Sequence, residues 1–257
     1  MAETYQTALE VVSTLPSLHS AAVFLDFDGT LVGFADSPMD VVVPEDLLQL
    51  LDRLHSTTSG ATALVSGRRL SDFETLMPSV TMPCVGGHGA EWRTGQGEQL
   101  HPMAGSEIVA GMQRAAQAFA TPRDGVLAEP KPAGVALHFR RAPDRAAEIE
   151  AFTAGLAAAH PGFEPHHGKN VCEIRPDDVN KGAALAKLMG MAPFQGRVPV
   201  MIGDDATDEP AMHIAQERAG IAIKVGEGTS VARHRVKDPA DVLSCLAQWT
   251  ITKGAAA

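Results

Sequence analysis

The sequence contains little cysteine, no long apolar run and comparatively few basic residues, and each shortage excludes a class of protein. Its three cysteines, Cys84, Cys172 and Cys245, are odd in number, far apart and in no Cys-x-x-Cys pair. That pattern argues against a disulfide framework or a zinc site. It fits a protein of the reducing cytoplasm, and we expect this location.

The lack of a long apolar run argues against a membrane protein, because a spanning helix needs about 20 such residues. Residues 1–20 also lack the basic start and apolar centre of a signal peptide. Lys and Arg number 21 against 31 Asp and Glu, which gives a formal net charge of −10 at pH 7. We therefore expect neither nucleic acid nor a membrane as a partner, and an anionic substrate would need a local basic pocket. The oligomeric state has no signature in the sequence.

Two blocks of the chain, from the start to about Glu91 and from Val198 onward, alternate short apolar runs with helical periodicity. We predict strands at 21–27, 61–66, 83–87, 198–203 and 221–226, and helices at 44–54, 66–77, 207–220 and 239–250. This alternation indicates an α/β fold with one parallel, doubly wound, Rossmann-like sheet and helices on both faces. A chain of 257 residues leaves room for such a core and a smaller insertion.

Between these blocks the predicted order changes to αββαββ. The helices are predicted at 106–120 and 144–160, and the strands at 125–132, 134–141, 163–167 and 170–176. This order suits an antiparallel sheet with helices on one face, and therefore a separate α+β domain inserted into the core. We predict a core of residues 1–100 and 178–257 and an inserted domain of residues 101–177.

Two aspartates, Asp26 and Asp28, follow the first predicted strand in the segment FLDFDGTLV. Ligands of open parallel sheets bind beyond the carboxyl ends of the strands, and side chains two apart on extended backbone point to the same face. A cation such as Mg²⁺ would offset the repulsion between the carboxylates, and Gly29 permits a sharp turn whose N–H groups can face an anion. The alternative is an ordinary Asp-Gly turn, and these residues alone support both interpretations equally.

The second predicted strand ends in VSGR, with Ser66 and Gly67 at the expected start of a helix. The Ser66 hydroxyl and the Gly67 N–H can bind a phosphate there, helped by the helix N-terminus. Taken alone, the segment is better explained as an ordinary N-cap, in which Ser66 satisfies the first turn of the helix.

A third predicted strand ends in IGDDATDE, which brings together Asp204, Asp205, Asp208 and Glu209. Acidic residues favour a helix N-terminus, but four exceed what capping requires, so a second group of cation ligands is the better interpretation. Lys181 begins a helix after the insertion, where the helix dipole disfavours a cation, although a single lysine is by default a surface residue. The joint occurrence of these segments at strand ends and helix starts favours one catalytic site.

In this order, DFDGTL, SGR, NKG and GDDATDE resemble the four motifs of the haloacid dehalogenase superfamily of phosphotransferases. The insertion lies where that superfamily places its larger type of cap. Within this frame, GGHGAE (Gly86–Glu91), EPKPAGVALHFR (Glu129–Arg140) and GKNVCEIRP (Gly168–Pro176) are similar to the trehalose-6-phosphate phosphatases. The resemblance implies a phosphatase that uses Mg²⁺ and an aspartyl-phosphate intermediate to hydrolyse trehalose 6-phosphate.

The resemblance also implies a role for each core residue. Asp26 would attack phosphorus, Asp28 would act as general acid and base, and Lys181 would bind phosphate oxygens. The substrate-binding residues expected in the core are Gly29, Thr30, Ser66, Gly67, Arg68 and His88. The expected metal-binding residues are Asp26, Asp28 through its backbone carbonyl, Asp204, Asp205 and Asp208. For Asp205 and Asp208, ligation through water and orientation of Lys181 both stay open.

Seven polar residues of the inserted domain are expected to recognise the sugar. They are Glu129, Lys131, His138, Arg140, Lys169, Glu173 and Arg175. Strand alternation places Glu129 with Lys131, His138 with Arg140, and Glu173 with Arg175 on shared faces. From the residues alone this is simply the solvated side of an antiparallel sheet, and the resemblance favours sugar recognition. Adjacent His166 and His167 point apart on a strand, so we assign them no role.

Three other functions stay open at this stage. A phosphatase of another sugar phosphate, such as sucrose phosphate, is the nearest alternative. A phosphohexose mutase has a similar core but would need a bisphosphate activator. A non-catalytic phosphosugar-binding module is disfavoured, because a binding module has no use for the nucleophile and metal ligands of the core.

Overall fold

Two separate sheets divide the chain into two units. Unit 1 comprises Met1–Glu98 and Asn180–Ala257, and unit 2 comprises Gln99–Val179. Both division points fall within two residues of those predicted from the sequence. The computed structural model describes residues 4–35, 38–94 and 97–254.

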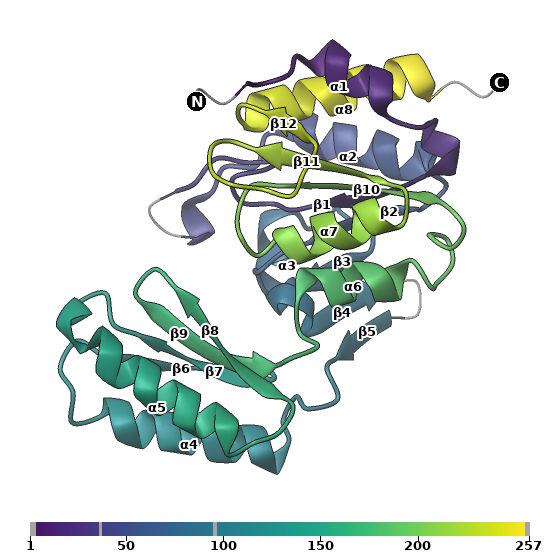
Figure 1. Ribbon diagram of the computed structural model, residues 1–257. Coiled ribbons are helices and arrows are strands. Elements are labelled where there is room, and N and C mark those ends of the chain that lie inside the picture. The colour runs from purple at the N-terminus through teal and green to yellow at the C-terminus, as the bar shows by residue number, and fades with distance from the viewer. Residues whose placement is uncertain (1–3, 36–37, 95–96, 255–257) are drawn as a thin grey trace. The chain divides into compact units, whose positions relative to one another are not determined.

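An eight-stranded sheet forms the centre of unit 1, with the strand order β12-β11-β10-β1-β2-β3-β4-β5 (Figure 1). The strands are β1 (Ala21–Leu25), β2 (Thr62–Val65), β3 (Cys84–Gly86), β4 (Glu91–Thr94), β5 (Gly97–Leu100), β10 (Val198–Gly203), β11 (Ile221–Val225) and β12 (His234–Val236). All pairs from β12 to β3 are parallel, which confirms the predicted α/β fold. The sheet continues beyond the predicted strands with β4, which pairs antiparallel with β3 because the short turn Gly87–Gly89 reverses the chain.

Helices cover both faces of this sheet, as predicted. They are α1 (Ala8–Thr14), α2 (Glu45–Thr57), α3 (Leu70–Leu76), α6 (Lys181–Leu188), α7 (Glu209–Glu217) and α8 (Pro239–Lys253). Alternate residues of the buried strand β1 supply the two cores. Val23 lies in one cluster with Leu51 of α2 and Trp249 of α8, whereas Phe24 lies in the other with Leu185 of α6 and Met212 of α7. Burial on both faces explains why the strand is a continuous apolar run.

The helix predicted over residues 66–77 is α3, and it begins only at Leu70. The segment before it stays outside the helix because it pairs with the turn between β3 and β4. The carbonyls of Ser66 and Arg68 accept hydrogen bonds of 3.0 and 2.8 Å from amides in that turn. Ser66 is therefore not a helix N-cap, and the expected help from a helix N-terminus at this position was also wrong.

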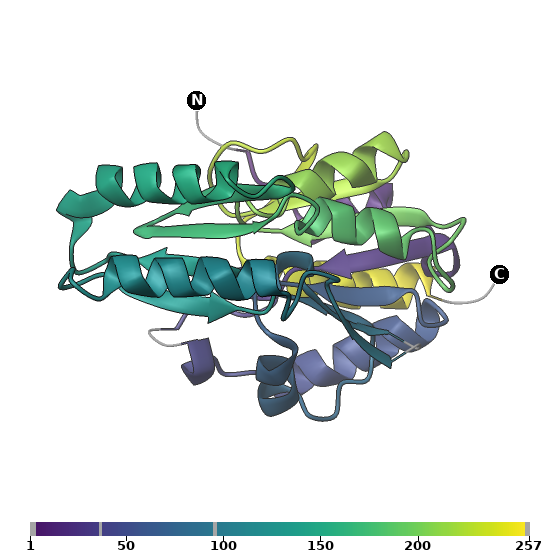
Figure 2. The same cartoon turned by 90° about the horizontal axis from the view of Figure 1, so that it is seen from below.

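Unit 2 has the predicted αββαββ order. Its elements are α4 (Glu107–Ala120), β6 (Leu127–Lys131), β7 (Gly134–His138), α5 (Ala146–Ala158), β8 (Phe163–Gly168) and β9 (Val171–Pro176). The four strands form an antiparallel sheet with the order β6-β7-β9-β8. Helices α4 and α5 lie on the same face of this sheet, as Figure 2 shows, and its apolar residues pack beneath them. The opposite face is left for polar side chains.

Among the helices of residues 4–35, 38–94 and 97–254, none combines the length and the apolar character that crossing a bilayer requires.

We predict that two glycines of unit 2 respond to alanine in opposite directions. A Cβ on Gly134 would lie 2.1 Å from the Ile174 carbonyl oxygen, whereas nothing lies within 4 Å of one on Gly155, in the middle of α5. Gly155→Ala should raise the free energy of unfolding by about 0.5–1 kcal/mol, because helix interiors favour alanine. Gly134→Ala should lower it by forcing β7 and β9 apart. Urea unfolding of the full chain, followed by circular dichroism, measures both changes, and equal effects would contradict the packing described.

Candidate active site

The carboxyl ends of two neighbouring strands bring three carboxylates together. Asp26 follows β1 and Asp204 follows β10, and these strands are parallel neighbours in the sheet. The Asp26 amide continues this pairing by donating to the Ile202 carbonyl at 3.0 Å. One carboxylate oxygen from each of Asp26, Asp204 and Asp208 lies within 4.8 Å of the others. The predicted acidic site therefore forms at the sheet edge where parallel strands end.

Lys181 lies at the centre of this site. It is the first residue of α6, whose N-cap Asn180 accepts the Ala183 amide, and its side chain is only 3% exposed. Its ammonium group donates to Asp26 Oδ1 at 2.7 Å and to Asp208 Oδ1 at 2.6 Å. The buried cation at a helix start thus has two carboxylate partners, which offset the cost of its burial.

The contacts of Asp208 favour one of the two roles left open for it. Its Oδ1 accepts from Lys181, and its Oδ2 accepts from the amides of Asp204 and Asp205 at 3.0 and 3.1 Å. With both oxygens engaged, Asp208 orients Lys181 and shapes the loop after β10. Asp205 Oδ1 accepts from the amide and the hydroxyl of Thr207 at 2.7 and 2.6 Å, so one of its two oxygens is held within the loop.

The acidic site has more negative charge than Lys181 can neutralise. Burial raises the pKa of Asp26 to about 7, although Lys181 opposes the shift. Burial, with the neighbouring Asp208 carboxylate, raises the pKa of Asp204 to about 6. Burial and Asp26 raise the pKa of Asp208 to about 7. Burial alone would lower the pKa of Lys181, but its two carboxylate partners outweigh burial and raise it.

The donor set of the site fits Mg²⁺. The three carboxylates supply the hard oxygen ligands that this ion prefers, and their spacing is compatible with metal–oxygen bonds of about 2.0–2.1 Å. A divalent cation would also favour the ionised form of these carboxyls, whose pKa values are raised chiefly by burial. Asp26 and Asp204 are the side chains with oxygens available to hold it.

Asp28 has a different partner from Asp26. Arg68 donates to both of its carboxylate oxygens, from Nε to Oδ2 and from Nη2 to Oδ1, each at 2.6 Å. The guanidinium also lies 5.3 Å from the centre of the Phe27 ring, which is fully buried. Both aspartates follow β1, but Asp26 is held by a lysine and Asp28 by an arginine in a bidentate pair.

Gly29 and Thr30 shape the carboxylate site. The Gly29 amide donates to the Val32 carbonyl at 2.8 Å, so this N–H group of the predicted turn is engaged within the loop. Gly29 has a φ of +77°, and a Cβ there would lie 2.2 Å from Asp204 Oδ2. The buried Thr30 hydroxyl lies 3.4 Å from Asp26 Oδ2 and 3.5 Å from Asp204 Oδ1. Glycine is therefore needed for the close approach of the two acidic loops.

Ser66, Gly67 and His88 come together through the turn that follows β3. Ser66 is 1% exposed, and its hydroxyl accepts the Arg68 amide at 3.2 Å. A Cβ on Gly67 would lie 2.5 Å from the His88 ring, so glycine lets the ring approach. His88 has a φ of +57°, a left-handed conformation that is uncommon outside glycine and often occurs at functional sites.

Lys224 stabilises the loop that carries Asp204, and it was not predicted from the sequence. It lies on β11, is 4% exposed, and donates to the carbonyls of Asp204 and Val225, the latter at 2.8 Å. Asp204 has its pKa raised mainly by burial, and the Lys224 charge opposes that shift. The signal available in the sequence was a lysine inside the apolar strand IAIKV.

Five of the seven polar residues predicted in unit 2 share the open face of its sheet. Glu129 accepts from Lys131 Nζ and pairs with His138 Nε2, both at 2.7 Å. Lys131 and His138 lower the pKa of Glu129 against the opposing effect of burial. Arg175 lies 3.8 Å from Glu173, whose pKa is raised by burial. The face is thus a set of partly buried charges in which donors and acceptors alternate.

The other two predicted residues lie beyond the ends of strands. Lys169 is exposed in the turn between β8 and β9. Arg140 is exposed after the end of β7, and with His138 and Arg141 it lines a pocket of about 480 Å³. Arg141 was not singled out from the sequence.

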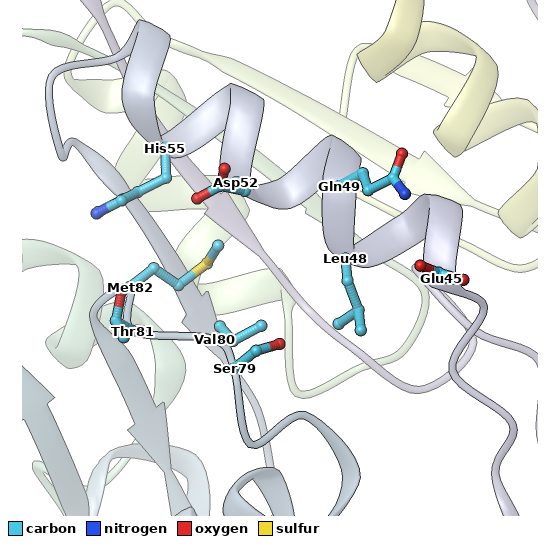
Figure 3. A pocket seen from close by; sticks show the side chains of 9 residues that line it. All are labelled: Glu45, Leu48, Gln49, Asp52, His55, Ser79, Val80, Thr81 and Met82. Carbon is cyan, nitrogen blue, oxygen red and sulfur yellow. The ribbon is translucent and has the colours of Figure 1, made fainter.

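A pocket of about 310 Å³ in unit 1 does not suit an anionic substrate. It lies between α2 and the segment before β3, with Glu45 and Asp52 on one side and Val80 on the other (Figure 3). Neither lysine nor arginine occurs among the described residues that line it. Burial lowers the pKa of its one histidine, His55, which disfavours a positive charge there. A phosphate ester therefore has no cationic partner in this pocket.

Comparison with known proteins points to one family. A sequence model of the family described as trehalose-phosphatase matches residues 24–244. The chain is 40% identical over 219 residues to a probable trehalose-phosphate phosphatase of Sinorhizobium fredii, which covers 85% of this chain and 82% of that protein. It is 34% identical over 242 residues to the trehalose-6-phosphate phosphatase of Escherichia coli, which covers 94% of this chain and 91% of that protein.

Solved structures resemble the whole fold. A trehalose-6-phosphate phosphatase related protein has a TM-score of 0.70 and 26% identity, over 90% of this chain and 97% of its own. The C-terminal domain of the C. albicans trehalose-6-phosphate phosphatase has a TM-score of 0.75 and 21% identity, over 96% of this chain and 99% of its own. At 21% identity, the similarity to the C. albicans domain shows a shared fold and nothing more.

We predict that Asp26→Asn stabilises the metal-free protein in a pH-dependent way. The carboxyl has an ordinary pKa of 3.8 and a folded pKa of about 7, so the folded state binds more protons between these values. Its ionised form therefore destabilises the fold fully above pH 7 and not at all below about pH 4. With chelator present, the variant should have a higher Tm than wild type at pH 8 and a similar Tm at pH 4. The exposed Asp124→Asn is the matched control, and an equal rise at both pH values would contradict the assignment.

Proposed function

We propose that this chain, which belongs to the trehalose-phosphatase family, hydrolyses trehalose 6-phosphate with Mg²⁺ through an aspartyl-phosphate on Asp26. As a member of this family it is a phosphoric monoester hydrolase. The observation that carries the proposed mechanism is the position of the buried Asp26 carboxylate. It accepts a hydrogen bond from Lys181 at 2.7 Å, and one of its oxygens lies within 4.8 Å of an Asp204 carboxylate oxygen. Phosphoryl transfer requires such a combination of a positioned nucleophile and stabilisation of negative charge.

Asp26 is suited to attack phosphorus. It is 4% exposed, and Lys181 holds its Oδ1, which leaves Oδ2 for the bond to phosphorus. As that bond forms, the bond between phosphorus and the sugar oxygen breaks, and the departing oxygen takes a proton from Asp28. Water then attacks the aspartyl phosphate, gives its proton to Asp28, and releases phosphate and the Asp26 carboxylate.

Mg²⁺ would be held by Asp26, Asp204 and the Asp28 carbonyl. When bound it supplies positive charge that neutralises the phosphate oxygens. Lys181 supplies the fixed cation of the site, and its two carboxylate partners hold it at the nucleophile. Lys224 fixes the loop of Asp204 by bonding to its carbonyl.

The hydrogen bonds between Asp28 and Arg68 have to break before Asp28 can donate or accept a proton. In the bidentate pair both of its oxygens accept hydrogen bonds from the guanidinium. A phosphate ester offers Arg68 competing acceptors of higher charge, and guanidinium binds phosphate in the same forked geometry. Binding of substrate by Arg68 would therefore release the Asp28 carboxyl for its role as acid and base.

The open face of the sheet in unit 2 supports recognition of a sugar. Glu129 with Lys131 and His138, and Glu173 with Arg175, present fixed donors and acceptors of the kind that bind hydroxyl groups. These groups hold one another in place without ligand, so little ordering would be needed on binding.

Phosphate release from a panel of esters tests the function. We expect Mg²⁺-dependent hydrolysis of trehalose 6-phosphate, far above sucrose 6-phosphate, glucose 6-phosphate and a small aryl phosphate, and no need for a bisphosphate activator. Similar rates on every ester would support the proposed mechanism but contradict the proposed substrate, while a required activator would favour the mutase.

Asp26→Asn should remove turnover and retain the fold. Activity near that of wild type would contradict the assignment of Asp26 as the nucleophile.

Glu173→Ala separates sugar recognition from phosphate chemistry. Glu173 lies on a central strand of the open face, and its loss should reduce kcat/KM for trehalose 6-phosphate by about tenfold or more, as for a lost charged hydrogen bond of 1.5–3 kcal/mol. Activity on the aryl phosphate should change little. The matched control is Glu107→Ala, an exposed acid at the start of α4, on the helix-covered side of the sheet. Equal losses on both esters would remove Glu173 from sugar recognition.

A further inference from the structure

Unit 2 contains a second cluster of possible metal ligands. It differs from the all-carboxylate site of unit 1 because it includes a nitrogen and a sulfur ligand. Glu150 of α5, His167 of β8 and Cys172 of β9 each offer one ligand atom, and these atoms lie within 4.8 Å of one another. His167 Nδ1 and Cys172 Sγ are 3.2 Å apart. Neither the proposed reaction nor the sugar-binding face uses any of the three.

Strand register explains how the cluster forms. His167 and Cys172 are directly paired in the β8–β9 hairpin, so their side chains lie side by side on one face. That face is the one covered by α5, which carries Glu150 (Figure 2). His166, one residue earlier, points to the opposite face, where Arg175 Nη2 lies 3.3 Å from its Nδ1. Alternation therefore selects one of the two adjacent histidines for the cluster.

The ligand atoms suit Zn²⁺. Thiolate, imidazole and carboxylate are its usual ligands, and three of them leave a fourth tetrahedral position for water. Metal bonds of about 2.0 Å to nitrogen and 2.3 Å to sulfur at a tetrahedral angle put these two atoms roughly 3.5 Å apart. The observed 3.2 Å between His167 and Cys172 needs only a small adjustment. Glu150 is exposed, so its side chain can move toward the ion without disturbing the core.

We propose that Glu150, His167 and Cys172 form a Zn²⁺ site that ties α5 to the β8–β9 hairpin. The ion reaches the cluster from solvent, because Glu150 and His167 are both exposed. The Cys172 thiol proton leaves to solvent as the metal–sulfur bond forms, and the ion replaces the proton with no change of oxidation state.

Cobalt distinguishes this site from the acidic site of unit 1. Co²⁺ follows zinc in its ligand preferences, and a cobalt–thiolate bond gives a charge-transfer absorption that an all-oxygen site lacks. The full chain, kept in saturating Mg²⁺, is titrated with Co²⁺ while its near-ultraviolet absorption is recorded. We expect a band that saturates at one equivalent and disappears when Zn²⁺ is added.

Variants assign the band to its ligands. Cys172→Ser and His167→Ala should lose it, and Glu150→Gln should weaken Co²⁺ binding at least tenfold. His166→Ala is the matched control for the histidine, and Asp204→Asn for the acidic site, and both should keep the band. If Cys172→Ser fails to fold, the two exposed positions still decide the question. A wild-type protein without the band, or a band that survives His167→Ala, would overturn the proposal and leave an ordinary hydrogen bond between His167 and Cys172.

A stability measurement adds a second readout. Because the ion joins a helix to a hairpin in the folded state only, Zn²⁺ should raise the Tm of wild type in the presence of Mg²⁺. The rise should be absent from His167→Ala and unchanged in His166→Ala. Hydrolysis has no part in this measurement, so its outcome is independent of the proposed function.

Discussion

The site of unit 1 depends on the burial of one ammonium group between two carboxylates. An unpaired buried charge costs several kcal/mol, and the hydrogen bonds that Asp26 and Asp208 accept from the buried Lys181 ammonium offset this cost. The packing of α6 against α7 makes this possible. A Cβ on Gly182 would lie 2.9 Å from Pro210, so glycine allows the two helix starts to approach. The electrostatics of the site therefore fix the arrangement of β1, α6 and α7 together.

That pairing leaves an excess of negative charge, which gives the site its chemistry. Asp204 brings a third carboxylate to a space that contains one lysine, and burial, together with repulsion between the carboxylates, raises the pKa values of all three acids. Lys224 lies close by, but its ammonium bonds to the Asp204 carbonyl and so holds the loop in place. The divalent cation that we propose between Asp26 and Asp204 would offset this excess of negative charge.

The acids of the site could be predicted from sequence because they depend on a general property of parallel sheets. Asp26 and Asp204 follow two neighbouring parallel strands. The carboxyl ends of parallel strands lie at the same edge of the sheet, so residues that follow them come close together. The pairing of Arg68 with Asp28 could not be predicted, because it requires the segment before α3 to stay outside the helix and pair with a turn about 20 residues later. Local propensity favoured an earlier helix start there, and tertiary hydrogen bonds overrode it.

The alternation of side chains along a strand decides which chemical groups each side chain meets, as well as how it packs. In the β8–β9 hairpin, His166 and His167 are identical residues one position apart, yet one lies beside Arg175 and the other beside Cys172. Burial and the Arg175 charge lower the pKa of His166 to about 4, so on the open face it is a neutral group among charged ones. His167 meets a sulfur and a carboxylate instead. A single sheet thus separates the charged face that we propose to bind hydroxyl groups from the ligands of the proposed Zn²⁺ site, because a period of two sends successive side chains into different surroundings.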